Sequence, residues 1–98
     1  MPRPSRARDV VVDAQPDVAL LASVAVLCHL GARITRYDAE AGTLEARVRR
    51  FLRPALIRLR AEPDGQATRL RVESDALGWA PMFRRFHGGL LDLMKEGA

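Results

Sequence analysis

The chain has 98 residues, 48% of them hydrophobic, and a formal net charge of +4 at pH 7. This length fits a single domain, and the hydrophobic fraction is too high for an intrinsically disordered chain. The only cysteine, Cys28, excludes an internal disulfide, and no group of cysteine and histidine residues has the spacing of a metal site.

The first eight residues are rich in proline and arginine, and we expect them to form a disordered basic tail ahead of a single α+β domain at residues 9–96. Three arginines and one aspartate give the first nine residues a charge of +2, so the rest of the chain carries only the other +2. The folded domain is therefore mildly basic. Residues 10–12 are three valines, and such a β-branched run predicts a short first strand.

Residues 16–30 predict a helix, with Pro16 in its first turn and Gly31 as a left-handed cap at its end. This helix is apolar on almost every side, which is typical of a helix that is covered on two sides. Its large-residue side should pack on a sheet and consists of Leu20, Leu21, Val24, Leu27 and Cys28. Its opposite side should be free to meet another subunit or a partner protein, and the interface candidates there are Ala19, Ala22, Ser23, Val26 and Leu30.

From residue 32 to residue 74 the pattern changes to the two-residue alternation of strands. Four strands are predicted, at 33–37, 43–50, 55–61 and 68–74, and the short turns between them make them antiparallel neighbours. The apolar positions that should face the core are Leu44, Ala46, Val48, Ile57, Leu59, Leu70 and Val72. The outward positions hold glutamates and the anion-binding candidates Arg47, Arg49, Arg58, Arg60, Arg69 and Arg71.

Pro81 is expected to open a second helix. Its apolar stripe consists of Met82, Phe83, Phe86, Leu90, Leu93 and Met94. Gly88 and Gly89 interrupt this helix, and each costs about 1 kcal/mol relative to alanine. Two adjacent glycines therefore indicate a kink or a close approach of another backbone.

The predicted fold is α+β, with the order β-α-β-β-β-β-α in two layers and both helices packed on one face of an antiparallel sheet. Over residues 10–94 this order resembles one repeat of the TATA-box-binding-protein-like fold and, more loosely, the helix-grip fold of the START and Bet v 1 proteins. The first family bends DNA with phenylalanines and an apolar sheet surface, whereas the outward positions here are arginine and glutamate, so DNA bending is not implied. The second resemblance implies a ligand held between the sheet and the last helix.

The outward arginines have two interpretations. Guanidinium groups suit phosphate or another polyanion, because their planar donors match its oxygens. Alternatively, Glu45, Glu62 and Glu73 pair with them, and the face is a solvated surface that opposes aggregation. No aromatic residue accompanies the arginines, although surfaces that bind single strands usually stack bases on aromatics. The solvated surface is the preferred interpretation, and nucleic acid is a possible but not a favoured partner.

The cluster Trp79, Met82, Phe83 and Phe86 either lines a pocket for a small apolar ligand or anchors the core, and we prefer the core. Cys28, His29 and His87 are too few for a zinc site, and Ser74, Asp75 and His87 lack the sequence around a hydrolase nucleophile. No catalytic residue, metal or cofactor is therefore expected.

The sequence thus predicts a small non-enzymatic interaction module, homodimeric through its first helix, in the cytoplasm and without a membrane partner. Polyanion binding by the arginine face and a helix-grip-like ligand site are the alternatives.

Overall fold

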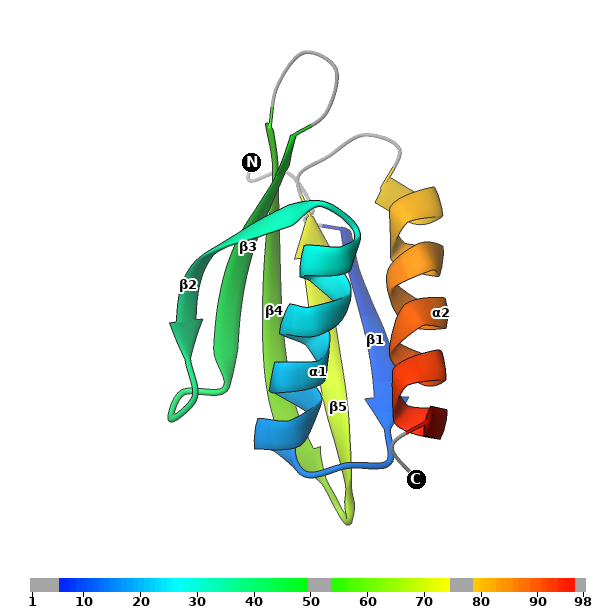
Figure 1. The fold of residues 1–98 in the computed structure, drawn as a ribbon. Helices are drawn as coiled ribbons and strands as arrows, with labels where there is room; N and C mark the ends of the chain where they lie inside the picture. Colours follow the sequence, from blue (N-terminus) through cyan, green and yellow to red (C-terminus); the bar gives the residue numbers. More distant parts are fainter. Residues whose placement is uncertain (1–5, 50–53, 75–78, 97–98) are drawn as a thin grey trace.

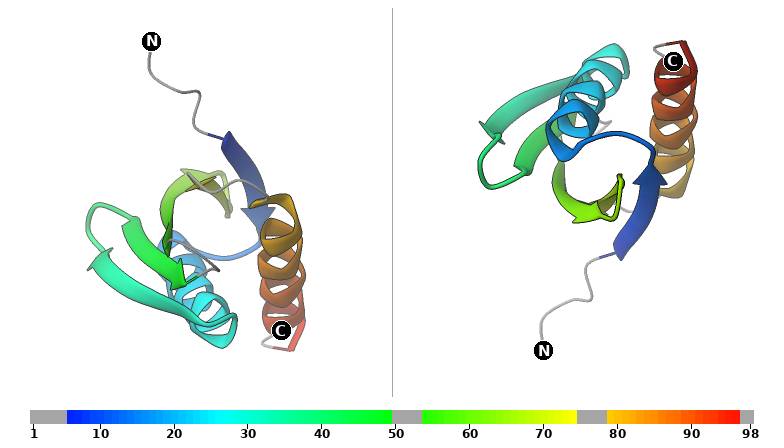
Figure 2. Two further views of the ribbon diagram at one scale, coloured as in Figure 1. Left: turned by 90° about the horizontal axis from the view of Figure 1, so that it is seen from above. Right: turned by 90° about the horizontal axis from the view of Figure 1, so that it is seen from below.

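The structure is a computed structural model that describes residues 6–49, 54–74 and 79–96. Its elements in chain order are β1 (Arg6–Val12), α1 (Pro16–His29), β2 (Ala32–Asp38), β3 (Thr43–Arg49), β4 (Pro54–Asp64), β5 (Ala67–Ser74) and α2 (Trp79–Glu96). The strands form one antiparallel sheet in the order β1-β5-β4-β3-β2. Both helices cover the same face of this sheet (Figures 1 and 2). The predicted α+β class, its element order and its two layers are therefore confirmed.

The alternation in the strands places their apolar residues between the sheet and the helices. All seven of the positions predicted to face the core on β3, β4 and β5 are buried, and Leu44, Ile57 and Leu70 are almost completely so. The antiparallel register aligns these residues in rows, with Leu44 opposite Leu59 and Leu59 opposite Val72. The arginine-bearing positions consequently face outward, on the side of the sheet without helices.

Two connections are fixed by specific contacts. In the loop between β2 and β3, the amide of Ala41 donates a hydrogen bond to Oδ1 of Asp38 at 3.0 Å. The next residue, Gly42, has a φ of 70° and accepts a hydrogen bond from the amide of Ala61 at 2.7 Å. Between β1 and α1, the carbonyl of Ala14 accepts a hydrogen bond from Oγ1 of Thr68 on β5 at 2.7 Å. This bond ties the segment before α1 to the beginning of β5, next to the edge strand β1.

The predicted disordered tail is wrong for residues 6–8, because β1 begins at Arg6 and pairs with β5 along its whole length. Residues 1–5 lie outside the described residues. Arg8 is on the helix side of the sheet, where its guanidinium carbon lies 5.3 Å from the centroid of the Phe83 ring. A cation over an aromatic face is attractive, and the stem of the arginine covers apolar surface. An arginine can therefore extend a strand at a position where the alternation requires an apolar residue.

The predicted orientation of α1 is also wrong. Four of the five interface candidates, Ala19, Ala22, Ser23 and Val26, are buried, and Leu30 is half-buried against the core. Two residues predicted to face the sheet, Leu21 and Cys28, are exposed. The physical reason is that α2 packs beside α1, and small side chains allow two helices to approach closely. The buried Ser23 hydroxyl donates to the carbonyl of Ala19 at 2.8 Å, so this polar group is satisfied.

Candidate interaction surfaces

The outer face of the sheet carries all six anion-binding candidates as exposed side chains. Four of them have a carboxylate partner. The ion pairs are Arg58–Glu45 at 3.5 Å, Arg60–Glu62 at 3.9 Å, Arg69–Asp64 at 3.4 Å and Arg71–Asp9 at 3.8 Å. Exposed pairs of this kind contribute about 0–1 kcal/mol each, because water and salt screen them. Their main effect here is to neutralise the middle of the face.

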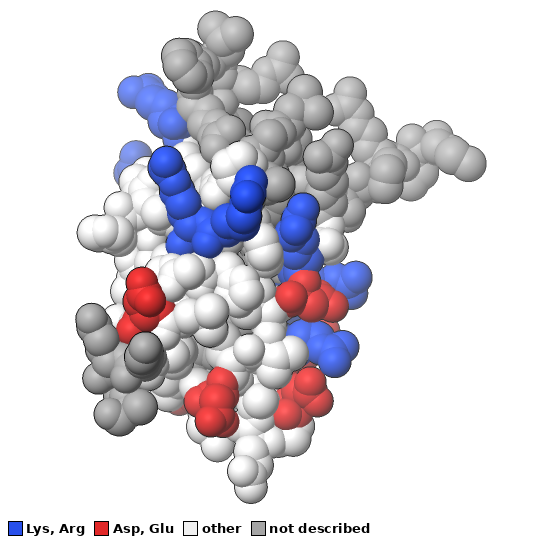
Figure 3. Space-filling view, turned by 90° about the vertical axis from the view of Figure 1, so that its right-hand side faces the viewer, with Lys and Arg blue, Asp and Glu red and all other residues white. Residues whose placement is uncertain are grey.

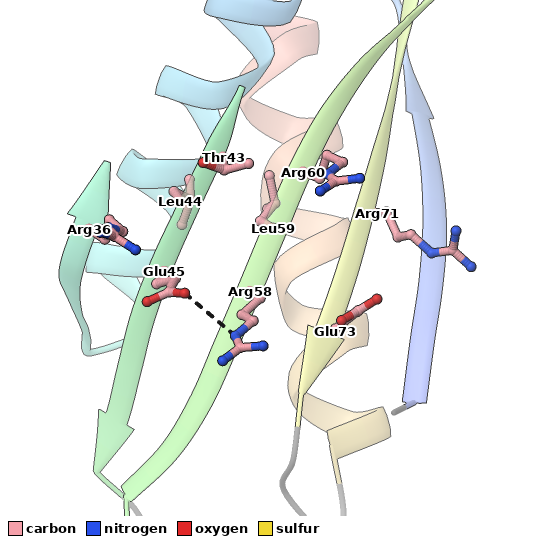
Figure 4. A pocket seen from close by; sticks show the side chains of 9 residues that line it. All are labelled: Arg36, Thr43, Leu44, Glu45, Arg58, Leu59, Arg60, Arg71 and Glu73. Carbon is pink, nitrogen blue, oxygen red and sulfur yellow. Dashed lines mark ion pairs between the residues drawn. The ribbon is translucent and has the colours of Figure 1, made fainter. Parts of the chain in front are cut away.

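A shallow hollow of about 370 Å³ lies in this middle region, between β3, β4 and β5 (Figure 4). Across it, the register places Arg36 opposite Glu45, Glu45 opposite Arg58, and Arg58 opposite Glu73. The charges therefore alternate in sign from strand to strand. Three of the four arginines that line the hollow already have a carboxylate partner, so an anion bound there would compete with those carboxylates. This arrangement supports the interpretation of the middle of the face as a solvated surface.

The other two candidates, Arg47 and Arg49, lie at the end of β3, beyond the hollow. Arg47 is directly opposite Arg33 of β2, a residue that the sequence analysis did not single out. All three side chains are exposed. None of them forms an ion pair with another residue in the described part of the chain. The six predicted arginines therefore separate into four that are paired and two that belong to a different cluster.

This cluster is one part of an uneven distribution of charge between the two ends of the sheet, among the residues that the structure describes. We call the end of the molecule where β1, β4 and α2 begin the basic end. Its described, exposed arginines are Arg8, Arg33, Arg47, Arg49, Arg84 and Arg85. The opposite end holds Arg60, Arg69 and exposed carboxylates, and this acidic end contains Asp13, Asp17, Asp38, Glu40, Glu62, Asp64 and Asp92. Seen from the side of α2, basic groups gather toward the upper end and acidic groups toward the lower end, and the two kinds lie side by side at the right-hand edge (Figure 3).

The sequence already contains the signal for this separation. In an antiparallel meander, alternate turns lie at opposite ends of the sheet. The turns 38–42 and 62–65 share one end of the sheet and carry carboxylates. The connection between β3 and β4 lies at the other end, and the residues that lead into it, at 47–50, are mostly arginine. Assigning charges to turns, and not only to faces, would have predicted it.

An apolar strip runs along the outward side of α1 and consists of Val18, Leu21, Ala25 and Cys28. Val18 is 49% exposed and Leu21 is 58% exposed, so both retain most of the apolar area that a partner can cover. The exposed apolar surface of α1 is therefore this strip and not the predicted interface candidates. The helix is apolar on its outward and on its buried side, as the sequence indicated.

The ligand-pocket candidates belong to the core where their side chains are described. Phe86 is completely buried, Phe83 is nearly so, and Met82 packs against the same cluster. The rings of Phe83 and Phe86 are 6.5 Å apart between centroids, a separation at which aromatic rings pack favourably. The side chain of Trp79 lies outside the described residues. These contacts are those expected of core anchors.

The residues considered for catalysis or metal binding are not brought together. Cys28 and His29 are exposed on α1, whereas His87 lies on α2 with its ring 5.9 Å from that of Phe83. Among the described residues, no group of three histidine, cysteine, aspartate or glutamate side chains could hold a metal ion. Ser74 is buried at the end of β5, and Asp75 lies outside the described residues.

Two further findings concern the chain as a whole. None of the helices at 16–29 and 79–96 is long and apolar enough to cross a membrane, in the part of the chain that the structure describes. Comparison of the sequence with models of known protein families and with curated proteins found no match.

Proposed function

We propose that this protein is a non-enzymatic interaction module that forms a homodimer through the apolar strip on α1. The observation that carries the proposal is the exposure of Val18 and Leu21 on a helix whose outward side has few charged groups. A surface helix normally presents polar residues to water. Here only Asp17 and His29 flank the strip, one near each end of the helix.

A two-fold axis beside α1 would place the strip of one copy on the strip of the other, because a symmetric dimer uses the same patch twice. Stable dimers bury roughly 800 Å² on each partner, which is more than one face of a four-turn helix supplies. The interface would therefore extend to the neighbouring end of α2, where Leu93 is 38% exposed. Only two large apolar side chains lie at the centre of this contact. We therefore expect a dissociation constant in the micromolar range, which corresponds to a free energy of dissociation of about 8 kcal/mol.

The test is the mass of the protein in solution, measured by light scattering over a range of concentrations. The monomer mass is 10.9 kDa. We expect the measured mass to rise toward twice this value as the concentration increases. Leu21→Glu should hold the protein at the monomer mass, because it introduces a charge into the centre of the contact.

Leu91→Glu is the matched control. Leu91 is 49% exposed on α2, nearly as much as Leu21, but it lies outside the strip. This substitution adds the same charge and should leave the dimer intact. A protein that is monomeric at every concentration, or a dimer that dissociates equally with either substitution, would show that α1 is not the interface.

A further inference from the structure

The basic end carries two clusters of exposed arginines, one on each side of the sheet. On the outer face, Arg33 and Arg47 are a directly opposed pair, and Arg49 follows two residues further along β3. In a sheet, such neighbours are about 5–7 Å apart. Like charges this close repel each other, so the cluster costs free energy unless an anion binds there.

The second cluster lies on the helix side, at the start of α2. Arg84 and Arg85 are exposed in the second turn of this helix, directly after Phe83. Arg8 reaches over the ring of Phe83 from β1, so a third guanidinium lies against the same turn of this helix. The contact with the ring restricts this side chain, so less conformational entropy is lost when it binds an anion.

From these two clusters we infer that the basic end binds the phosphate backbone of a nucleic acid. Two groups of guanidinium ions at one end of a small domain match a long polyanion better than a single small anion, because a polyanion contacts both groups at once. The carboxylates of the acidic end would be repelled by the same polyanion, so only one end of the protein can approach it. The four arginines paired with carboxylates take no part.

The described residues around the clusters fit a nucleic acid better than a lipid membrane. The exposed large apolar residues of the described chain are Val11, Val18, Leu21, Tyr37, Leu91 and Leu93, and none of them belongs to the basic end. Stable membrane attachment normally combines basic residues with apolar side chains that enter the bilayer. Phe83 is buried and cannot stack on bases, so the contacts that the described residues of this end can make are to phosphates.

The experiment measures binding of a short fluorescein-labelled DNA duplex of mixed sequence by anisotropy, as sodium chloride is raised. Binding at low salt should weaken steeply, because each neutralised phosphate contributes about −0.9 to the slope of log K against log salt. The double substitution Arg33→Gln with Arg47→Gln should reduce the magnitude of this slope by about 2. Arg84→Gln with Arg85→Gln should act in the same way.

The matched control is Arg60→Gln with Arg69→Gln, which removes the same charge from arginines that are already paired with Glu62 and Asp64. It should leave the slope nearly unchanged. Equal losses in all the double variants would mean that binding follows net charge alone, and would overturn the inference. So would a failure to bind the duplex at low salt, or binding to phosphatidylserine vesicles without binding to DNA.

The inference does not depend on the proposed dimer. Leu21 is not part of the basic end. The Leu21→Glu variant should therefore bind DNA with the same slope of log K against log salt, per protein copy, as the unsubstituted protein. Loss of the dimer with retained DNA binding would therefore separate the two proposals.

Discussion

Gly89 of α2 lies directly against Val26 of α1, and a Cβ atom added at Gly89 would be 3.0 Å from Cγ1 of Val26. The two adjacent glycines predicted a kink or a close approach of another backbone, and the structure instead places a side chain of α1 against one of them. This contact also explains the orientation of α1, because the small-residue side of that helix has to face α2 for the two helices to pack at this distance. Gly88, one residue earlier, has open space where its Cβ would be.

Substitution by alanine should therefore change the free energy of unfolding differently at the two glycines. Gly88→Ala should stabilise the protein by up to about 1 kcal/mol, because alanine is the better helix former. Gly89→Ala gains the same propensity but compresses Val26, and overpacking costs about 1–3 kcal/mol, so it should be neutral or destabilising. Urea denaturation measures both free energies. Adding Val26→Ala should reduce the penalty at Gly89, and an equal gain at both glycines would contradict the packing.

Adjacent residues on α1 provide a second prediction. Ala22 is only 8% exposed, whereas Leu21 points away from the core. Ala22→Glu should unfold the protein or lower its stability by several kcal/mol, because it buries a charge without a partner. Leu21→Glu should retain the circular dichroism spectrum and change stability by about 0.5 kcal/mol or less. The reverse order of the two effects would mean that the helix is rotated as the sequence first indicated.

Alanine substitutions at two turn glycines test the packing of the loop between β2 and β3. Gly42 lies in this loop, and Gly65, in the turn between β4 and β5, is the control. Both have positive φ, which costs roughly 1–2 kcal/mol for a residue with a Cβ. At Gly42 the added atom would also lie 2.8 Å from the carbonyl oxygen of Ala61, whereas Gly65 has open space. Gly42→Ala should therefore lower the melting temperature more than Gly65→Ala. Equal shifts would show that the loop does not press on β4.

The hydrogen bond from Thr68 to Ala14 should stabilise the connection between β1 and α1. Thr68→Val keeps the shape of the side chain but leaves the carbonyl of Ala14 without this donor, at a cost of about 1–3 kcal/mol. Thr35→Val is the control, since Thr35 is exposed and water can replace its 3.2 Å bond to the carbonyl of Glu45. Chemical denaturation of both variants gives the comparison, and a Thr68 variant as stable as the control would contradict this role.

Much of the sheet could be predicted because alternation fixes which side of a strand faces the core. Leu59 and Leu70, for example, have arginines on both sides in the sequence, so a shift by one residue would bury those charges. The start of β1 escaped prediction because Arg8 and Asp9 do not resemble strand residues. Their partners, Phe83 and Arg71, are distant in the sequence.

The surfaces were harder to predict than the fold. The rotation of α1 could not be read from hydrophobicity, because Leu21 and Leu20 are equally apolar and only one of them can face the core. The placement of Arg47 and Arg58 on one face was predicted correctly. Their different surroundings follow from the register, which sets Arg58 opposite Glu45 and Arg47 opposite Arg33. Pairing across strands is a property of the assembled sheet and is only weakly encoded along the chain.

The separation of the basic end from the acidic end gives the described part of the molecule an electric dipole, in addition to the net positive charge of the chain. In the field of a polyanion such a molecule experiences a torque in addition to an attraction, so it turns before it touches. At physiological salt this field is screened over about 8 Å, and the rotation is therefore confined to the final approach. A copy that arrives in this way keeps Val18 and Leu21 on its trailing half, where they stay accessible to a second copy from solution.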